Sequence, residues 1–522
     1  MKRLVLLFAS LSCFAAQGQV LRWSAQGDPQ TMDPHSQNES LTNAVNGQVY
    51  EKLTRRDKQL GIVPGLATEW VQVSPLVWRF KLRPGVKFHD GTPLTADDVV
   101  FSVQRAQQPS SQISPYAHAV GTPRQVDALT VEFTTPGFDP IFLQHIDTIQ
   151  IMSRRWCEEH KVTKPLDYNN KEETWASLHA NGTGAYMLVS RQPDIKTVWK
   201  RNPNWWNKFE GNVQDVVFTP IANDATRLAA LVSGEVDFVL DPSPRDVPRL
   251  RSTPGVKIID GPENRLIFIG MDQARDKLLY GRVPGDRNPF KDARVRRAMY
   301  QAIDVETMRT KIMNGLSMPT GGLTPTPDGD FRDPALEARL PFDIAAARKL
   351  MTEAGYADGF EVTLDCPNNR YINDEAICKA LAAMWAQLKI KVRVAALPRA
   401  LYFPKVEKLD TSLYLWGWGG NITDAEIIMT PVYRNRGERG VGYYNYGNVR
   451  NDRFDSLAAQ SSTEQDPKKR EELIKAALAE YQRQIHVIPL HRQMIPWGAR
   501  SNVSVVHRAD NWLEVSWASV GK

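Results

Sequence analysis

The 522-residue sequence has few of the patterns that enzyme active sites and metal centres require. Four cysteines and nine histidines occur in the whole chain, and none stands in a Cys-x-x-Cys or His-x-x-x-His spacing that would hold zinc. The chain also lacks a Gly-x-Ser-x-Gly nucleophile elbow and a Gly-x-x-x-x-Gly-Lys phosphate loop. We therefore expect no catalytic residues, no metal site and no cofactor, and a binding function is favoured over an enzyme.

Long hydrophobic runs are absent after the N-terminus. Residues 1–18 combine a basic start, an apolar run from Leu4 to Ala16 and a small residue at Gly18, which is typical of a cleaved secretory signal peptide. Cys13 lacks the leucine three positions earlier that a lipoprotein site requires, because Ser10 stands there, so we expect no lipid anchor at Cys13. No later run approaches the ~20 apolar residues that cross a bilayer, and the mature chain is expected to be soluble.

A strong excess of one charge is also missing. The chain has 65 Lys and Arg against 59 Asp and Glu, a formal net charge of +6, and the two signs are interspersed without a basic block. Nucleic-acid binding is therefore not expected. About 500 residues exceed what one hydrophobic core usually supports, so the sequence predicts two or three lobes.

Three cysteines follow the signal peptide, at Cys157, Cys366 and Cys378. An oxidising compartment allows a disulfide, and Cys366 and Cys378 flank a predicted loop-to-helix junction where they can approach each other. Free buried thiols that pack as small apolar residues are the alternative. The sequence leaves both possibilities open.

Alternation and helical spacing predict an α/β protein. In residues 61–106 a β-meander is expected, with strands at Trp70–Val73, Val77–Leu82 and Val86–His89 before a helix that begins after Thr95. Residues 292–308 have the spacing of one amphipathic helix. Further along, strands at 361–365, 390–395 and 411–416 alternate with helices at 374–388 and 400–408. Right-handed crossovers in this order predict a parallel sheet.

Four segments resemble a known family: the meander at 61–106, Asn181–Leu188 with its Gly-Thr-Gly-Ala-Tyr run, Asn202–Trp206 and Asn288–Ala298. Together they resemble the bacterial extracellular solute-binding proteins of family 5, the peptide- and nickel-binding class of ABC transporters. The resemblance implies an α/β, two-lobed periplasmic-binding-protein type II fold (cluster C) with an extra small domain and a hinge. It implies lobe I at 19–60, 181–270 and 490–522, an accessory domain at 61–180 and lobe II at 271–489.

The resemblance also implies a function. The chain would be the periplasmic component of an ABC importer that captures a short peptide or peptide-like carboxylate by hinge closure. It would act as a monomer and deliver the solute to permease subunits in the inner membrane. A metal-chelate, haem or opine receptor of the same fold is the alternative among binding proteins. From another class, an extracytoplasmic hydrolase would need a nucleophile with a placed base, and the sequence contains no recognisable set.

The first candidate ligand loop, Asp365–Glu375, follows one predicted strand and precedes a helix. Open parallel sheets bind ligands beyond the carboxyl ends of their strands, so Arg370 is expected at the mouth of the cleft, where its guanidinium fork suits a carboxylate. In the family that the chain resembles, an Arg in this loop holds the carboxylate of short peptides, and Tyr371 is a candidate to stack on the ligand. The alternative is that Arg370 pairs locally with Asp374 or Glu375.

The second candidate loop follows the strand at 411–416. Trp416 and Trp418, beside glycines, offer flat apolar walls, although a core position is equally open for Trp416. Peptide-binding members of the family have Trp-x-x-Asp here, with the Asp pairing to the peptide's ammonium group, whereas this chain has Asn421 in that place. Because an amide cannot neutralise a buried ammonium, either Asp424 takes over or the ligand lacks a free amine there.

Two further candidates, Asn38 and Glu39, lie between the first predicted strand and the first helix. They are expected to reach the cleft from the opposite lobe, and a solvated loop is the alternative. The predicted ligand-binding residues are therefore Arg370, Asn421, Trp418, Trp416, Asp424, Tyr371, Asn38 and Glu39.

Overall fold

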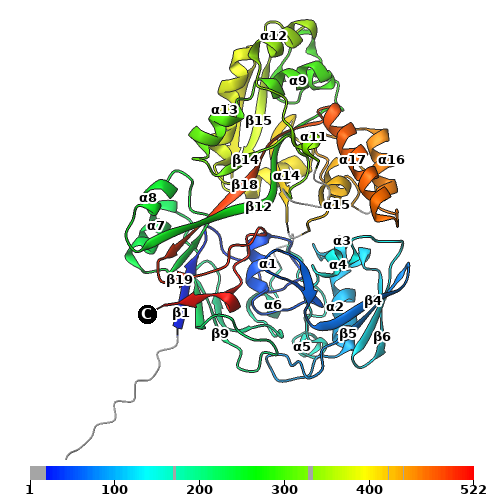
Figure 1. Cartoon of the computed structure of the whole chain (residues 1–522), viewed down its shortest axis with the longest axis vertical. Helices are drawn as coiled ribbons and strands as arrows, with labels where there is room; N and C mark the ends of the chain where they lie inside the picture. The colour runs from blue at the N-terminus through cyan, green and yellow to red at the C-terminus, as the bar shows by residue number, and fades with distance from the viewer. Residues whose placement is uncertain (1–18, 169–171, 327–332, 421, 439, 522) are drawn as a thin grey trace, which may run out of the picture.

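The computed structural model describes residues 19–168, 172–326, 333–420, 422–438 and 440–521. The expected signal peptide with Cys13 lies outside these residues, and so does Asn421. One mixed sheet runs through the molecule, with its strands in the order β13-β15-β17-β12-β18-β11-β1-β10-β9-β8. This sheet joins the upper and lower halves of the chain in Figure 1.

Two long antiparallel strands, β12 (Val256–Met271) and β18 (Val487–Arg500), pass between the two halves. Val256 pairs with Arg500 at the lower end, and Gly270 pairs with Val487 at the upper end. The register of the pair shifts between Pro262 and Leu266. An irregularity of this kind bends a strand locally and re-aims its side chains, so the crossing point is where polar side chains can leave the sheet.

The lower half of the sheet, which we call lobe I, is parallel at its centre. There β1 (Gln19–Ser24) pairs with β10 (Val213–Phe218) on one side and β11 (Phe238–Leu240) on the other. The connecting helix α7 (Asp224–Ser233) begins at Asn223, whose side chain accepts from the Thr226 amide, and ends at Gly234 with φ +83°. The other elements are α1 (Ser40–Asn46), β8 (Tyr186–Gln192), β9 (Lys196–Arg201), α8 (Val247–Arg251), β19 (Val503–Ser504) and β20 (Ser519–Val520).

An accessory domain with its own antiparallel sheet packs beside lobe I. Its elements are β2 (Thr54–Arg56), β3 (Ile62–Pro64), β4 (Ala67–Ser74), β5 (Val77–Leu82), α2 (Ala96–Ala106), α3 (Ser114–Ala119), β6 (Thr122–Asp127), β7 (Thr130–Thr134), α4 (Phe142–Ile146), α5 (Arg154–Glu159) and α6 (Trp175–Leu178). The strand predicted at Val86–His89 is wrong, and β7 takes its place beside β5. The Phe88 amide donates to the Thr92 carbonyl within a turn, and the His89 amide donates to the Gly182 carbonyl.

The upper half, lobe II, contains the predicted βαβαβ order. β15 (Glu361–Pro367) is parallel to β16 (Lys391–Leu397) and β17 (Leu413–Gly419), and α13 (Asp374–Trp385) and α14 (Arg399–Glu407) connect them. The parallel sheet is therefore confirmed. The other elements are β13 (Gly281–Arg282), β14 (Ser317–Pro319), α11 (Pro334–Glu337), α12 (Ile344–Glu353), α15 (Glu426–Ile428), α16 (Asp452–Ser461) and α17 (Pro467–Arg483).

The single helix predicted over residues 292–308 is interrupted. α9 (Ala293–Gln301) is followed by a break, after which the Asp304 side chain caps α10 (Val305–Thr307) by accepting from the Thr307 amide. Apolar spacing continues through both pieces, since Met299 and Met308 are both buried in the lobe II core. The periodicity therefore could not show the break, whereas the capping residue does.

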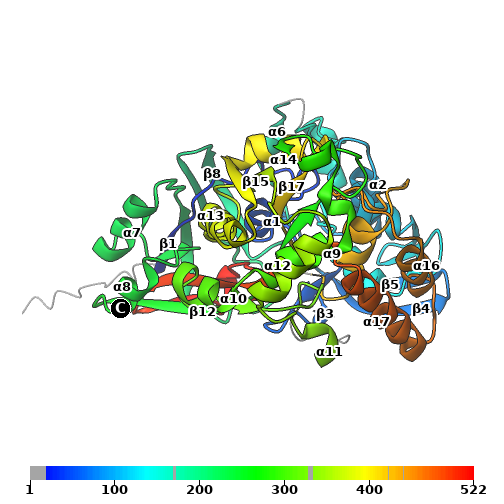
Figure 2. The ribbon, with the colours of Figure 1, turned by 90° about the horizontal axis from the view of Figure 1, so that it is seen from above.

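Each body has a hydrophobic core of its own, and the accessory domain also touches lobe II. Ile141, in the accessory domain, is buried in one cluster with Trp416 and Tyr433 of lobe II. Figures 1 and 2 place the α16–α17 pair on the same side of the molecule as the accessory sheet. The accessory domain and lobe II therefore share a buried apolar contact beside the crossing strands.

The cysteine alternatives are resolved for the described chain. Cys366, in β15, is disulfide-bonded to Cys378, in α13, while Cys157 is a free buried thiol. Burial raises the pKa of the Cys157 thiol to about 12, so it is a packing residue rather than a nucleophile. In the part of the chain that the structure describes, no helix has the length and apolarity to cross a membrane.

Candidate ligand-binding site

A cavity of about 520 Å³ lies where the two lobes meet. Lobe I contributes the segment after β1, the start of α1 and the loop after β11, while lobe II contributes the loop between β15 and α13 and the start of α14. The crossing strands supply the residues at the register shift, Glu263 and Arg265, together with Gln493. The cavity therefore touches both lobes and the strands that join them.

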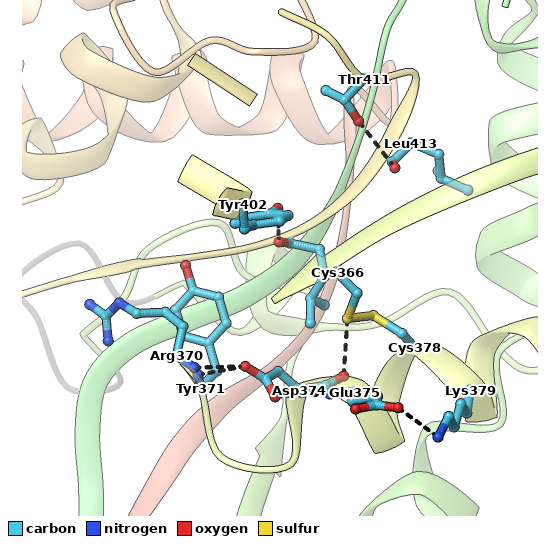
Figure 3. Close-up of a disulfide and its surroundings, with 11 residues drawn as sticks. Cys366, Arg370, Tyr371, Asp374, Glu375, Cys378, Lys379, Tyr402, Thr411 and Leu413 are labelled. Atoms are coloured by element: carbon cyan, nitrogen blue, oxygen red, sulfur yellow. Dashed lines mark hydrogen bonds and ion pairs between the residues drawn. A yellow bond between two sulfur atoms is a disulfide. The ribbon is translucent and has the colours of Figure 1, made fainter. Parts of the chain in front are cut away.

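The loop that carries Arg370 is fixed at its base and at its tip (Figure 3). The Cys366–Cys378 disulfide ties the end of β15 to α13. The buried Asp374 carboxylate accepts from the backbone amides of Arg370 at 2.9 Å and Tyr371 at 3.0 Å. Burial raises the pKa of Asp374 to about 6, while these amide bonds lower it. The loop is thus held before any ligand arrives, which reduces the entropy lost on binding.

The Arg370 guanidinium makes neither of the local ion pairs that the sequence left open. Asp374 is occupied by backbone amides, and Glu375 pairs with Lys379 at 2.7 Å. The guanidinium instead lies near the Tyr371 ring, 5.2 Å from its centroid, and turns away from Asp374 in Figure 3. Burial, and then the positive charge of Arg265, lower the pKa of Arg370. An uncompensated cation at a cavity wall favours an anionic ligand.

Tyr371 lines the cavity but is itself held by lobe II. Its ring is buried, and its hydroxyl donates to the Gly417 carbonyl at 3.1 Å. A Cβ atom on Gly417 would lie only 2.7 Å from the Tyr371 ring, so the glycine in β17 is what allows the ring to pack there. Tyr371 therefore offers one face of a fixed ring to the cavity.

A second guanidinium lies on the cavity floor, at Arg265. Its side chain is 8% exposed, and its Nε donates to Glu263 at 2.8 Å. Gln493 donates to the same carboxylate at 2.5 Å and accepts from the Ile372 amide at 3.1 Å. Sequence reasoning missed Arg265, although a lone cation before the apolar run Leu266–Gly270 was a usable signal.

The lobe I wall contains Glu39 but not Asn38. Glu39 caps α1 by accepting from the Thr42 amide at 3.0 Å, and its other oxygen lies 3.7 Å from the Arg399 guanidinium of lobe II. Asn38 is exposed and bonds to Gln112 of the accessory domain at 3.1 Å, away from the cavity. Arg399, which reaches across the lobes, was missed from the sequence because its partner is hundreds of residues away.

Asp241 is a third cavity residue, after Arg265 and Arg399, that the sequence did not point to. It follows β11, has φ +52° and lies exposed to the cavity. Asn511 donates to its two oxygens at 3.1 and 3.3 Å. Surrounding protein, and then the charge of Glu263, raise the pKa of Asp241 to about 6. The available signal was the turn sequence Asp-Pro-Ser-Pro directly after a parallel strand.

The second predicted loop lies apart from the cavity in the described residues. Trp416 is 4% exposed and packs edge-on against Tyr446, with ring centroids 4.8 Å apart. Trp418 donates from its indole to the Ile427 carbonyl at 2.5 Å and is half-buried. Neither indole is a lining residue. The structure therefore places Trp416 in the core, which is one of the two positions that the sequence left open. Trp418 lies at the edge of that core.

Asp424 differs from its predicted role as a substitute for the missing aspartate. Its two oxygens accept from both terminal nitrogens of Arg470, at 2.8 and 2.9 Å, and the pair is buried. A carboxylate that already balances a buried guanidinium is not free for a ligand ammonium. Asn421, between these residues, lies outside the described part of the chain.

The two halves are also held together outside the cavity. The Asn314 side chain of lobe II donates to the Pro244 carbonyl of lobe I at 3.1 Å. On the other side, the Thr423 amide donates to Gln144 of the accessory domain at 2.9 Å. Among the described residues, no group of three His, Cys, Asp or Glu side chains is placed to hold a metal ion. The site is a cavity between the lobes, lined by charged side chains, of a kind suited to binding a small polar molecule.

Comparison with known proteins agrees with this architecture. Haem-binding protein A of Haemophilus influenzae is 25% identical over 86% of this chain and 82% of its own length. The dipeptide-binding protein of Pseudomonas aeruginosa is 25% identical over 92% of this chain and 90% of its own length. The solved structure of the periplasmic binding protein DppA from Helicobacter pylori, in complex with the peptide STSA, has a TM-score of 0.82 at 21% identity and covers 97% of this chain and 98% of that one.

The likeness to that structure confirms the predicted two-lobed periplasmic-binding-protein fold. A family model, described as bacterial extracellular solute-binding proteins, family 5 middle, matches residues 61–440. The matched range includes the accessory domain, the crossing strand β12 and the loop that carries Arg370. The chain belongs to the bacterial extracellular solute-binding proteins of family 5.

Proposed function

We propose that this protein is the periplasmic binding component of an ABC importer and that it captures a short peptide or a peptide-like carboxylate. The observation that carries the proposal is the Arg370 guanidinium, which lines the interlobe cavity and has no acidic partner among the described residues. A ligand carboxylate would supply the charge and hydrogen bonds that this group lacks. The names of the relatives support a small solute of this kind, since one is a dipeptide-binding protein and a structural neighbour holds a peptide.

The size of the cavity is compatible with such a solute. Its volume of about 520 Å³ falls within the roughly 300–1,000 Å³ of small-ligand sites. No histidine or methionine is among its described lining residues. A haem or metal-chelate ligand therefore gains no soft or imidazole ligand from the described wall, whereas an opine, which also carries carboxylates, would use the same guanidinium.

Closure follows from where the ligand contacts lie. Arg370 belongs to lobe II, Arg265 to a crossing strand, and Glu39 to lobe I. A solute that touches all three binds the closed arrangement better than the open one, and that difference alone shifts the equilibrium toward closure. The closed monomer would then dock on the permease subunits and release its ligand.

The test is a titration of the purified protein with an equimolar pool of L-dipeptides, read by native mass spectrometry and by thermal shift. We expect a one-to-one complex and a higher melting temperature, because a ligand that binds only the folded state stabilises it. The same samples are then analysed for free amino acids. Unbound protein at millimolar peptide contradicts the peptide proposal, and released amino acids indicate a hydrolase instead of a receptor.

A further inference from the structure

We propose that Asp241 binds a cationic group of the ligand, so that the cavity selects a zwitterion with its carboxylate at Arg370 in lobe II and its ammonium at Asp241 in lobe I. The inference rests on the proposed function, since it assigns the second pole of the same ligand. It also places the acidic partner in lobe I.

The charges that line the described cavity are almost all paired within the protein. The pairs are Glu39 with Arg399 at 3.7 Å, Asp224 with Arg227 at 2.7 Å, Arg245 with Asp246 at 3.6 Å, Glu263 with Arg265 at 2.8 Å and Glu375 with Lys379 at 2.7 Å. Asp374 is satisfied by backbone amides. Two groups are left among the described lining residues: the cation of Arg370 and the anion of Asp241.

Within the described part of the chain, the one hydrogen-bond partner of the Asp241 carboxylate is the neutral side chain of Asn511. Asn511 donates to both carboxylate oxygens, at 3.1 and 3.3 Å, and no Lys or Arg of the described chain lies within ion-pair distance. The nearby Glu263 adds a second negative charge, and it raises the pKa of Asp241 together with the surrounding protein. Glu263 is already paired with Arg265, so a ligand cation at this end of the cavity would be held by Asp241 and would offset its repulsion with Glu263.

The backbone fixes the direction of this carboxylate. Asp241 directly follows β11, which is parallel to β1, and so stands at the strand end where open sheets bind ligands. Its φ of +52° is uncommon outside glycine, and Asp is among the residues that tolerate it. The following loop is held by the bond from Asn314 of lobe II to the Pro244 carbonyl. The carboxylate is thus presented from lobe I by a loop that lobe II also contacts.

Opposite charges on opposite lobes have a consequence for closure. A zwitterion that meets Arg370 and Asp241 together bridges the two lobes by charge, whereas an N-blocked peptide satisfies lobe II alone. Because closure responds only to the difference in affinity between the open and closed states, the free amine should be what couples binding to closure. Asp241 would then take the amine-binding role that the Asp of the Trp-x-x-Asp pattern has in peptide-binding members of the family.

The probes are an equimolar pool of Xaa-Ala L-dipeptides and the same pool after N-acetylation. Asp241→Asn removes the charge, keeps the shape and suits the positive φ, so the variant should fold. Glu235→Gln, an exposed site of lobe I outside the cavity, is the matched control. Each protein is mixed with each pool, retained peptides are identified by native mass spectrometry, and their Kd values are measured by calorimetry.

We expect the wild-type protein and Glu235→Gln to retain free-amine peptides and not their acetylated forms. Asp241→Asn should bind the same free-amine peptides at least tenfold more weakly and should lose the preference for the amine. Equal retention of both pools by the wild-type protein, or unchanged affinity in Asp241→Asn, would overturn the inference and leave the proposed function standing. Retention of neither pool would refute the proposed peptide ligand and this assignment with it.

Discussion

Replacing Arg370 by alanine should weaken a carboxylate ligand without weakening the fold. The guanidinium has no acidic partner among the described residues, so its hydrogen-bonding capacity is available to the ligand. A hydrogen bond to a charged group contributes about 1.5–3 kcal/mol, and the two-pronged contact of an Arg with a carboxylate is among the strong cases. The Kd for a dipeptide should therefore rise by about 10- to 150-fold.

The stability of the ligand-free protein should stay the same or increase in Arg370→Ala. Burial and the charge of Arg265 lower the pKa of Arg370. A base whose folded-state pKa lies below its unfolded value destabilises the folded state at every pH where it is charged in the unfolded chain, which includes neutral pH. Removing the charge should therefore leave the melting temperature unchanged or raise it.

Calorimetric titration and differential scanning calorimetry of Arg370→Ala measure the two quantities separately. Arg297→Ala, at an exposed site on α9 of the same lobe, controls for the loss of one positive charge. Wild-type affinity in Arg370→Ala would remove Arg370 from the site. A large fall in melting temperature would show that the guanidinium serves the fold, and the reasoning from its missing partner would then be refuted.

Three further changes test the disulfide of the Arg370 loop, the charge of Asp241 and the structural role of Asp424. Changing Cys366 and Cys378 to serine together should lower the unfolding free energy by about 2–3 kcal/mol and reduce peptide affinity, measured by urea unfolding and calorimetry; full affinity would mean that the disulfide does not position the loop. Affinity for free-amine peptides should fall as the pH drops below about 6, because the raised pKa of Asp241 lets the empty site take up a proton; a profile that Asp241→Asn does not flatten would contradict this origin. Asp424→Asn should lower the unfolding free energy by about 1.5–3 kcal/mol, because it weakens the charge-assisted hydrogen bonds from Arg470, with unchanged peptide Kd, and a selective loss of affinity would return Asp424 to the site.

Local pattern was enough to predict the order of strands and helices from β15 to β17 in lobe II. The parallel order of β15, β16 and β17 follows from alternation, caps and crossover handedness. Prediction failed where backbone bonds go to distant segments. The apolar alternation of Val86–His89 indicated a strand, but the His89 amide is used by Gly182, nearly a hundred residues away.

The candidate site divides in the same way. Arg370, Tyr371 and Glu39 were accessible from the sequence because each lies at a junction between a strand or loop and a helix. Arg265 and Asp241 enter the cavity only through the pairing of strands far apart in the chain, which no local window contains. Conversely, Asp424 looked available because its partner, Arg470, stands 46 positions later.

The most direct test of the account is native mass spectrometry of the protein purified without refolding from a bacterial periplasm, in wild-type and Arg370→Ala forms. We expect the wild-type protein to carry one small solute with at least one carboxylate, identified by tandem fragmentation. The same solute should be absent or much reduced in Arg370→Ala. A retained solute without a carboxylate, or equal occupancy in the two proteins, would contradict the claim that Arg370 anchors an anionic ligand between the lobes.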